Sequence, residues 1–264
     1  MSRYASMFER LVGQREAALG AFLMLGDPDL ETSARLLGAL VEGGADMVEV
    51  GIPFSDPVAD GPVIQAAAKR ALDAGVRVAD CFDLIAAFRS RHTEIPVGIL
   101  TYANLVMARG REHFFIRAAQ AGADSLLIAD LPAREAEPWT SGMLEAGLEP
   151  VLIAATNTPP DALRAISSLG RGYTYCVTRA GVPGGGGSPH FDRELVDRLR
   201  TAGAPPPVFG FSIASGAHVR AAIAAGAAGV ISGSALVSAV AEGRNLASLV
   251  ARLKSATRND SAPD

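Results

Sequence analysis

The sequence predicts an α/β fold, a single (β/α)8 barrel with an extra N-terminal helix, and three observations support this. The chain has 264 residues, close to the roughly 250 that such a barrel usually needs. A glycine, a small residue and a short apolar run recur along the chain, with helix-period segments between the runs. The runs are continuously apolar rather than alternating, which is typical of strands buried on both faces of a parallel sheet.

The apolar runs give eight expected strands. Four of them follow a glycine that is typical of the C-terminal end of a helix, and these are residues 43–51, 121–130, 146–154 and 225–233. The other four are residues 19–25, 96–102, 172–177 and 207–212. Helical segments between successive strands indicate parallel pairing through helical crossovers.

An open doubly wound sheet is the alternative fold. It would normally show a G-x-G-x-x-G fingerprint after the first strand, and that strand is followed instead by GDPD. No stretch has the composition of a linker, so we expect one domain over residues 1–256. Residues 257–264 lack apolar periodicity and are expected to form a disordered tail.

Composition argues against several classes of function. The net charge is −4 and no long basic run is present, so a nucleic-acid partner is not expected. Glycines and serines break the longest apolar stretch, so no membrane span is expected. Charged residues near the N-terminus stand where a signal peptide has its apolar region, which predicts a cytoplasmic protein. The two cysteines and four histidines lack metal-ligand spacing, so no metal is expected.

The segment VEVGIPFSDPVADGP, residues 48–62, places an acid inside a core strand. Counted from the preceding glycine, Glu49 takes the same place as Leu127 and Ile231 in their strands, so it should face the barrel axis. Reactive groups lie at the carboxyl ends of barrel strands, and desolvation moves the pKa of a carboxyl toward the range that suits proton transfer. We interpret Glu49 as functional. The alternative is a structural glutamate satisfied by a neighbouring tyrosine or arginine.

Two further candidate groups follow from loops. Asp56 and Asp60 come directly after Glu49 and are either functional or solvated helix caps. A phosphate site is indicated at ISGSA, residues 231–235, where a strand ends and a helix can begin with free backbone N–H groups. The candidate donors on loops six to eight are Gly184, Ser212, Gly233 and Ser234.

These segments resemble the alpha subunit of tryptophan synthase over nearly the whole chain. The matching stretches include SMFERL, AFLMLGDPD, VEVGIPFSDPVADGPVIQ, ILTYANLV, GRGYTYCVTRAGVPG and ISGSALV, of which the third is highly specific. The resemblance implies a TIM-barrel lyase of tryptophan biosynthesis. Its reaction is the retro-aldol cleavage of indole-3-glycerol phosphate to indole and glyceraldehyde 3-phosphate.

The resemblance also implies a role for each candidate residue. Glu49 would protonate indole C3 and also handle the glycerol hydroxyl proton. Asp60 would accept a hydrogen bond from the indole N–H and stabilise the positive charge that develops on the ring, so the two environments should push the two pKa values apart. The indole pocket would consist of Phe22, Leu100, Leu127, Ala129, Ile153, Tyr175, Phe211 and Ile231.

A partner is implied in the same way. Asp56, flanked by Pro53 and Pro57, matches the loop that contacts the beta subunit of an α2β2 heterotetramer. Pyridoxal phosphate in that beta subunit joins indole to serine. The alpha chain itself is expected to need no cofactor.

Three positions depart from the family pattern, and they keep two other functions open. Met24 and Pro183 stand where threonines are usual, and Ser212 stands where a glycine is usual. Because the last two touch lid closure and phosphate binding, one alternative is a catalytically weak chain that mainly binds and regulates a beta partner. Another is a different phosphate-binding barrel. Such barrels need a strand-end lysine or another acid–base pair, and no predicted strand contains a lysine.

Overall fold

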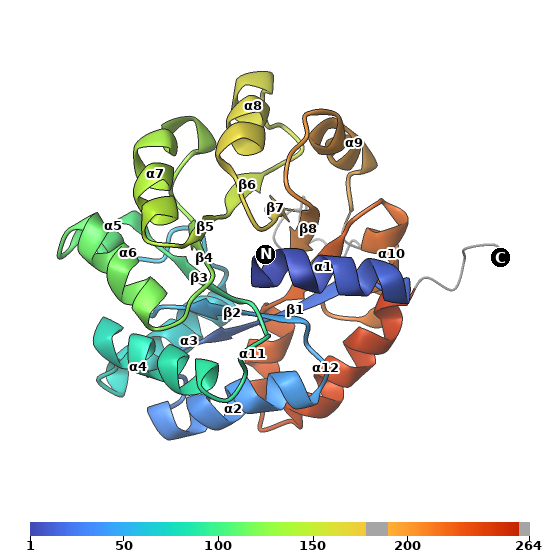
Figure 1. Cartoon of the computed structure of the whole chain (residues 1–264). Coiled ribbons are helices and arrows are strands. Elements are labelled where there is room, and N and C mark those ends of the chain that lie inside the picture. Colours follow the sequence, from blue (N-terminus) through green and yellow to red (C-terminus); the bar gives the residue numbers. More distant parts are fainter. Residues whose placement is uncertain (178–189, 259–264) are drawn as a thin grey trace.

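The computed structural model describes residues 1–177 and 190–258 and shows parallel strands inside a ring of helices (Figure 1). Its strand order is β5-β4-β3-β2-β1-β9-β8-β7-β6, and the neighbours pair in parallel. The strands are β1 (Ala18–Met24), β2 (Met47–Gly51), β3 (Val97–Thr101), β4 (Ser125–Ile128), β5 (Glu149–Pro150), β6 (Leu152–Ala154), β7 (Thr174–Val177), β8 (Pro207–Gly210) and β9 (Gly229–Ser232).

The two strands at the ends of this order, β5 and β6, are consecutive in the chain and are separated only by Val151. The Val151 N–H donates to the Leu126 carbonyl at 3.1 Å, so the chain stays on β4 across the break. The predicted strand at residues 146–154 is therefore shorter than expected and split in two. Pro150 stands at the break and has no N–H to donate to the ladder. With these two pieces counted as one strand, the predicted (β/α)8 barrel is confirmed.

Helices fill the crossovers, and several begin at a side chain that accepts a backbone N–H of the first turn, as expected of N-caps. These capping residues are Ser2, Asp29, Asp192, Ser215 and Asn245. The helices are α1 (Arg3–Gln14), α2 (Leu30–Glu42), α3 (Pro62–Asp73), α4 (Val78–Arg89), α5 (Ala103–Met107), α6 (Arg111–Gln120), α7 (Glu137–Glu145), α8 (Pro160–Leu169), α9 (Arg193–Thr201), α10 (Gly216–Ala224), α11 (Ser234–Ala241) and α12 (Leu246–Lys254), with short 3-10 helices η1 (Ala133–Glu135) and η2 (Ser255–Thr257).

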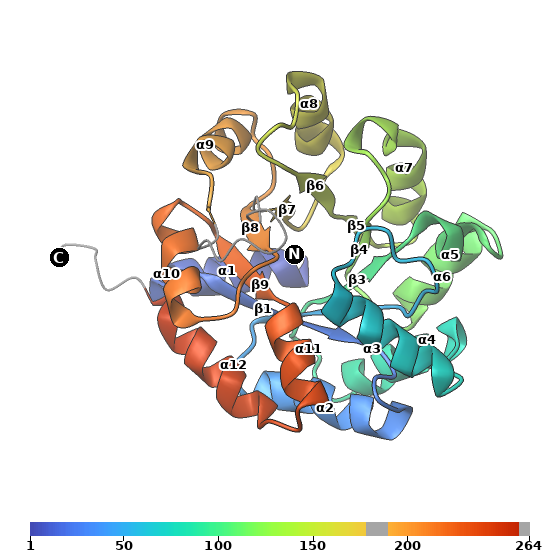
Figure 2. The same cartoon turned by 180° about the vertical axis from the view of Figure 1, so that it is seen from behind.

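The predicted N-terminal helix, α1, lies across the amino-terminal end of the barrel (Figure 1). The Tyr4 ring packs against Tyr173 with ring centroids 5.4 Å apart, and the Tyr4 hydroxyl bonds the Ser125 hydroxyl at 2.8 Å. The helix therefore covers this end of the barrel. The view from behind shows α3 and α11 in front of the strands (Figure 2), at the carboxyl ends of β2 and β9.

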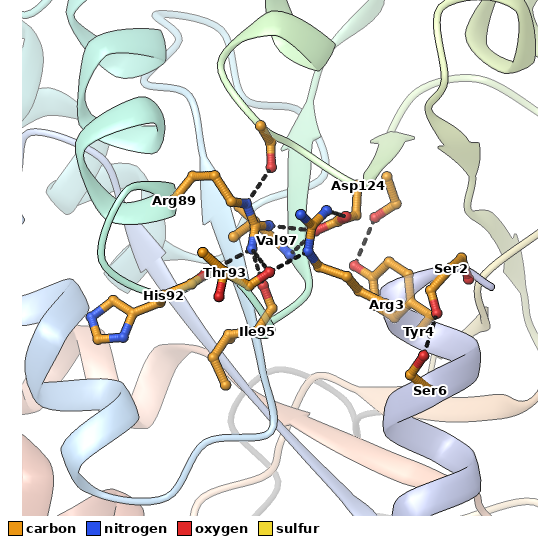
Figure 3. Close-up of polar contacts among 12 residues, drawn as sticks. Ser2, Arg3, Tyr4, Ser6, Arg89, His92, Thr93, Ile95, Val97 and Asp124 are labelled. Atoms are coloured by element: carbon orange, nitrogen blue, oxygen red, sulfur yellow. Dashed lines mark hydrogen bonds and ion pairs between the residues drawn. The ribbon is translucent and has the colours of Figure 1, made fainter.

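Ion pairs join helices to strands at the amino-terminal end of the barrel, which α1 covers (Figure 3). Asp124, directly before β4, accepts from the Arg3 guanidinium at 2.7 Å and from the Arg89 guanidinium at 2.6 Å. Its Oδ2 also accepts the Val97 backbone N–H at 2.7 Å. One carboxylate thus ties α1 and α4 to the start of β3 and β4. We refer to Asp124, Arg3 and Arg89 as the Asp124 cluster.

The C-terminal boundary differs from the expected one at two residues. Thr257, assigned by the sequence to the tail, is fully buried in η2, and its carbonyl accepts the Ala17 N–H at 3.0 Å. Arg258 forms an isolated bridge with Glu16. Residues 259–264 lie outside the described residues, and the extent of the domain otherwise stays a prediction. Within the described part, no helix combines the length and apolarity that crossing a membrane requires.

Candidate active site

A cavity of about 320 Å³ opens at the carboxyl ends of the strands. It brings together residues of β1, β2, β3, β7 and β9 with the first turn of α3, the residues after β8 and the start of α11. Its lining consists of Phe22, Glu49, Asp60, Gly61, Pro62, Val63, Ile64, Leu100, Tyr175, Phe211, Ser212, Ile231, Gly233 and Ser234.

Glu49 points into this cavity from the middle of β2. Ile231 lines the same cavity, and Leu127 pairs in register with the cavity residue Leu100, so all three share the inward face that the sequence predicts. The Glu49 side chain is only 3% exposed. Tyr173 donates a hydrogen bond of 2.8 Å to its Oε1, and no other hydrogen bond to this carboxyl is present among the described residues.

The surroundings of Glu49 favour its protonated form. Burial raises the pKa of Glu49 to about 7, the Tyr173 hydrogen bond opposes this, and the negative charge of Asp60 adds to the rise. A carboxyl with this pKa exchanges its proton readily near neutral pH. The predicted tyrosine neighbour is present, but it satisfies one oxygen only, and the carboxyl still faces the cavity.

Asp60 reaches the cavity from the loop between β2 and α3. Its neighbour is Tyr102, at the end of β3, whose hydroxyl accepts the Ala59 N–H at 3.3 Å. Burial raises the pKa of Asp60, and a hydrogen bond from Tyr102 lowers it again. Burial, followed by the charge of Asp60, raises the pKa of Tyr102, so this phenol remains a proton donor. Both acids of the cavity are therefore held by phenol groups.

The pKa values of Glu49 and Asp60 are both raised, so the expected contrast between them is one of degree. Burial acts in the same direction on both, and the shift is larger for Glu49, which is enclosed by the barrel, than for the half-buried Asp60. Glu49 is therefore the more easily protonated of the two. Asp60, the weaker proton holder, is the one suited to carry a negative charge beside a developing cation.

Five of the eight predicted indole-pocket residues line the cavity: Phe22, Leu100, Tyr175, Phe211 and Ile231. The other three lie at the same end of the barrel but not in its lining. Leu127 is buried on β4, Ala129 directly follows β4 and donates its N–H to the Thr101 carbonyl at 2.8 Å, and Ile153 on β6 pairs in register with Tyr175.

Tyr175 depends on a glycine beside it. A Cβ built on Gly210 would come within 2.0 Å of the Tyr175 hydroxyl oxygen, too close for any side chain. The ring of Tyr175 also meets Phe211 edge-on, with centroids 6.1 Å apart. The end of β8 thus leaves space for the aromatic wall of the cavity.

Three of the four predicted phosphate donors line the cavity. Gly233 and Ser234, the N-cap and first residue of α11, line it together with Ser212. Backbone N–H groups at a helix N-terminus bind anions. Among the described residues, no lysine or arginine is in the lining, so the donors available here are backbone N–H groups and the hydroxyls of Ser212 and Ser234. Gly184 lies outside the described residues, as does Pro183.

Ser212, one of the departures from the family pattern, has a left-handed backbone conformation, which glycine adopts most readily. Phe211 and Ser212 have φ angles of 61° and 58°, and such left-handed conformations cost side-chain-bearing residues roughly 1 kcal/mol. The Ser212 carbonyl oxygen lies 2.8 Å from Nδ1 of His218, which holds the turn. Met24 is buried at the end of β1, where its Cε would lie 3.0 Å from a Cβ on Gly51.

The predicted partner loop lies beside the cavity rather than in it. Asp56 is exposed, Pro57 is half-buried and Pro53 is buried. The sequence did not single out the first turn of α3, which supplies Gly61, Pro62, Val63 and Ile64 to the cavity. A signal was present, because the proline after Gly61 marks a helix start. Across the described residues, no group of three His, Cys, Asp or Glu side chains could hold a metal ion.

The fold and this cavity define a (β/α)8-barrel enzyme of the acid–base class. Comparison with known proteins narrows the class. The family described as tryptophan synthase alpha chain matches residues 8–262. A tryptophan synthase alpha chain from Serratia proteamaculans is 45% identical over 267 residues, which cover 98% of this chain and 100% of the relative. One from Shewanella amazonensis is 49% identical over 238 residues, which cover 90% of each.

Solved structures agree. A crystal structure of tryptophan synthase from M. tuberculosis, in its aminoacrylate-bound form, superposes with a TM-score of 0.87 and 34% identity, covering 98% of this chain and 100% of that chain. The chain belongs to the tryptophan synthase alpha chain family, whose members are lyases that act on indole-3-glycerol phosphate and form part of a complex with a beta chain.

Proposed function

We propose that Glu49 and Asp60 carry out the retro-aldol cleavage of indole-3-glycerol phosphate in the cavity at the carboxyl ends of the strands. The observation that carries this proposal is the Glu49 carboxyl, 3% exposed, facing that cavity, with a pKa raised to about 7 by burial. A substantial fraction of such a carboxyl is protonated at neutral pH, so it can deliver a proton to carbon and accept one from oxygen.

The reaction follows from these two groups. Glu49 protonates indole C3, which turns the ring into a leaving group, and Asp60 accepts the indole N–H and stabilises the positive charge that appears on the ring. The carboxylate left on Glu49 removes the proton of the hydroxyl on the adjacent carbon. The C3–C1′ bond then breaks, its electron pair returns to the ring as indole forms, and the aldehyde of glyceraldehyde 3-phosphate remains.

The rest of the cavity supports this orientation. Phe22, Leu100 and Ile231 offer apolar contacts for a flat ring, and Tyr175 and Phe211 add an aromatic wall. The indole then lies between the two acids, with Leu127, Ala129 and Ile153 behind the lining. Gly233 and Ser234 hold the phosphate through backbone N–H groups, with Ser212 beside them and Gly184 as the fourth predicted donor.

Glu49→Gln tests the proposal. The amide keeps the shape and the contact with Tyr173 but cannot deliver a proton, so indole release should fall by on the order of 10²–10⁴. Glu149→Gln is the control. Glu149 is another partly buried acid with a raised pKa, but it lies at the opposite end of the barrel. Near-normal turnover by Glu49→Gln would overturn the role of Glu49. Absence of indole release by the parent chain, alone and with a beta chain, would instead favour the regulatory alternative.

We also propose an α2β2 assembly with a beta chain, in which Asp56 makes a charged contact. Its carboxylate is exposed on a loop stiffened by Pro53 and Pro57, so little side-chain and loop freedom is lost on binding. Sedimentation of the mixture should give a mass of two alpha and two beta chains, and Asp56→Ala should lose activation by the beta chain. Asp73→Ala, which removes another exposed acid, is the control. Intact activation in Asp56→Ala would remove Asp56 from the interface.

The alpha chain supplies only proton transfer and binding, so we propose that it uses no cofactor of its own. Pyridoxal phosphate then belongs to the beta partner, where indole is consumed. We place the reaction in the cytoplasm. Both cysteines are free and buried, which suits a reducing compartment.

A further inference from the structure

A second cavity, of about 610 Å³, lies outside the barrel and shares no residue with the lining of the catalytic cavity. It lies between α4, α5 and α6 and the loop residues 53–55. We refer to it as the flank cavity. Its volume falls in the range of roughly 300–1,000 Å³ that small-molecule sites have. Neither step of the lyase reaction uses it.

The flank cavity combines an apolar interior with positive charge. Phe82, Val106 and Phe114 are among its buried apolar residues. The charged side chains in its lining are Arg77, Arg109 and Arg117, joined by His113, and no aspartate or glutamate in the described part of the chain lines it. The surface around the opening therefore attracts anions, while the interior accepts an apolar group.

The three arginines are available for a ligand. Among the described residues, none of them forms a salt bridge, although the Arg117 guanidinium lies 5.6 Å from the centroid of the Phe82 ring. Carboxylates near them in the sequence are already engaged. Asp80 accepts the backbone N–H of Arg77 at 2.8 Å, and Glu112 pairs with Arg111 at 2.8 Å.

We propose that the flank cavity binds a small carboxylate with an apolar body, such as an aryl-alkanoate or a medium-chain fatty acid. Its carboxylate would lie between the guanidiniums of Arg109 and Arg117, which offer paired N–H donors of the geometry that suits a carboxylate. Its apolar body would fill the interior beside Phe82 and Phe114, removing apolar surface from water.

The position of the cavity gives binding a route to the catalytic acids. Phe54 forms part of its wall, and the Phe54 ring packs against Tyr102 with centroids 5.3 Å apart. Tyr102 in turn holds Ala59 and Asp60. A ligand that moves Phe54 therefore acts on the loop that carries Asp60 through one intervening side chain.

Calorimetric titration of the full chain with 4-phenylbutyrate tests the proposal. We expect saturable binding, at least about tenfold tighter than for 4-phenyl-1-butanol, which has the same apolar body and no charge, because a charge-assisted hydrogen bond is worth about that factor. Indole, which the proposed function places in the other cavity, should not displace the ligand: coupling through Phe54 can change the affinity only to a limiting value that further indole does not alter. Equal affinity for acid and alcohol, or competition by indole, would overturn the proposal.

Variants locate the site. Arg109→Gln combined with Arg117→Gln should weaken binding by about tenfold or more, and Ala108→Trp, at an exposed position of the lining, should block it by filling space. Arg91→Gln with Arg252→Gln removes two arginines elsewhere and should bind like the parent. Parent-like binding by the Arg109/Arg117 pair or by Ala108→Trp would show that the ligand lies elsewhere. Because these titrations involve no turnover, their failure leaves the lyase proposal intact.

Discussion

The two candidate catalytic acids at the carboxyl end of the barrel and the acids near α1 at the amino-terminal end have opposite kinds of partner. At the amino-terminal end, Asp124 lies between the guanidiniums of Arg3 and Arg89 and accepts a backbone N–H as well (Figure 3). At the carboxyl end, Glu49 and Asp60 have tyrosine hydroxyls as neighbours, and no lysine or arginine of residues 1–177 and 190–258 lines their cavity. The same kind of side chain is thus paired with cations in the Asp124 cluster, whereas Glu49 and Asp60 have neutral hydrogen-bond partners.

Asp46 repeats the amino-terminal arrangement. It accepts from Arg10 at 3.1 Å, from Lys254 at 2.7 Å and from the backbone N–H of Leu19 at 2.9 Å. A cation beside a carboxylate favours the charged form strongly, whereas a phenol supplies one hydrogen bond and no charge. Asp124 and Asp46, which have cationic partners, therefore contribute to the stability of the barrel. Glu49 and Asp60, which have phenol neighbours instead, are the acids proposed for its chemistry.

Asp124→Asn tests whether the Asp124 cluster stabilises the fold. The substitution leaves two arginines without their carboxylate. Of these, Arg3 is 39% exposed and Arg89 is 13% exposed, so we take the lower end of the cost of breaking a buried pair, about 3 kcal/mol of unfolding free energy. Urea denaturation measures this, with Asp197→Asn as the control, because Asp197 and Arg200 are both exposed and their pair should contribute under about 1 kcal/mol. Turnover per folded molecule should stay at the parent level. A stability loss no larger than that of the control would contradict the assignment.

Glu49→Gln should increase the stability of the protein relative to the parent as the pH rises, whereas Asp124→Asn should decrease stability. The pKa of Glu49 is raised from 4.5 to about 7 in the folded protein, so folding favours the protonated form. Its contribution to stability is complete below pH 4.5 and is lost as the pH rises to about 7. Relative to the parent, the glutamine variant should therefore gain on the order of 3 kcal/mol between pH 4 and pH 8.

Denaturation of both proteins at a series of pH values checks this, because other titrating groups cancel in the difference. A difference that stays constant with pH would mean that burial does not raise the pKa of Glu49. A difference that moves in the parent's favour as the pH rises would mean that its carboxylate is stabilised in the folded state. Either result would remove the contrast between the two ends of the barrel.

The fold was predictable because its signals are local. Glycines at helix ends and continuous apolar runs mark the strands and crossovers, and the alternation then implies parallel pairing. The break at Val151 was not predicted, because the apolar run continues through it. The helix α5 was missed because its five residues are too short for a helical period.

The site was predictable in part. Glu49 stands out as an acid in an apolar strand, and Asp60 lies in a motif specific enough to identify a family. Their tyrosine partners were not assigned, because Tyr173 lies 124 positions from Glu49 in the chain and only the closed barrel brings them together. The Asp124 cluster was missed for the same reason, since Arg3 and Asp124 are 121 positions apart.

Tyr173→Phe removes a single oxygen atom and tests whether the Tyr173 hydroxyl sets the pKa of Glu49. The Tyr173 hydroxyl donates to Glu49 and lowers its pKa, so its loss should raise that pKa above about 7. A reaction that needs protonated Glu49 should then persist to higher pH, with the alkaline midpoint of kcat moving up by about one unit, the size of one charge-assisted hydrogen bond. Tyr4→Phe is the matched control, because the Tyr4 hydroxyl bonds Ser125 and the Tyr4 ring packs on Tyr173. If both variants shifted the midpoint equally, general loosening of the aromatic pair would explain the shift. If Tyr173→Phe lowered the midpoint, the phenol would not be stabilising the Glu49 carboxylate. An upward shift confined to Tyr173→Phe would show that a neutral hydrogen bond sets the proton affinity of Glu49. Asp124, by contrast, has two guanidinium groups as its partners.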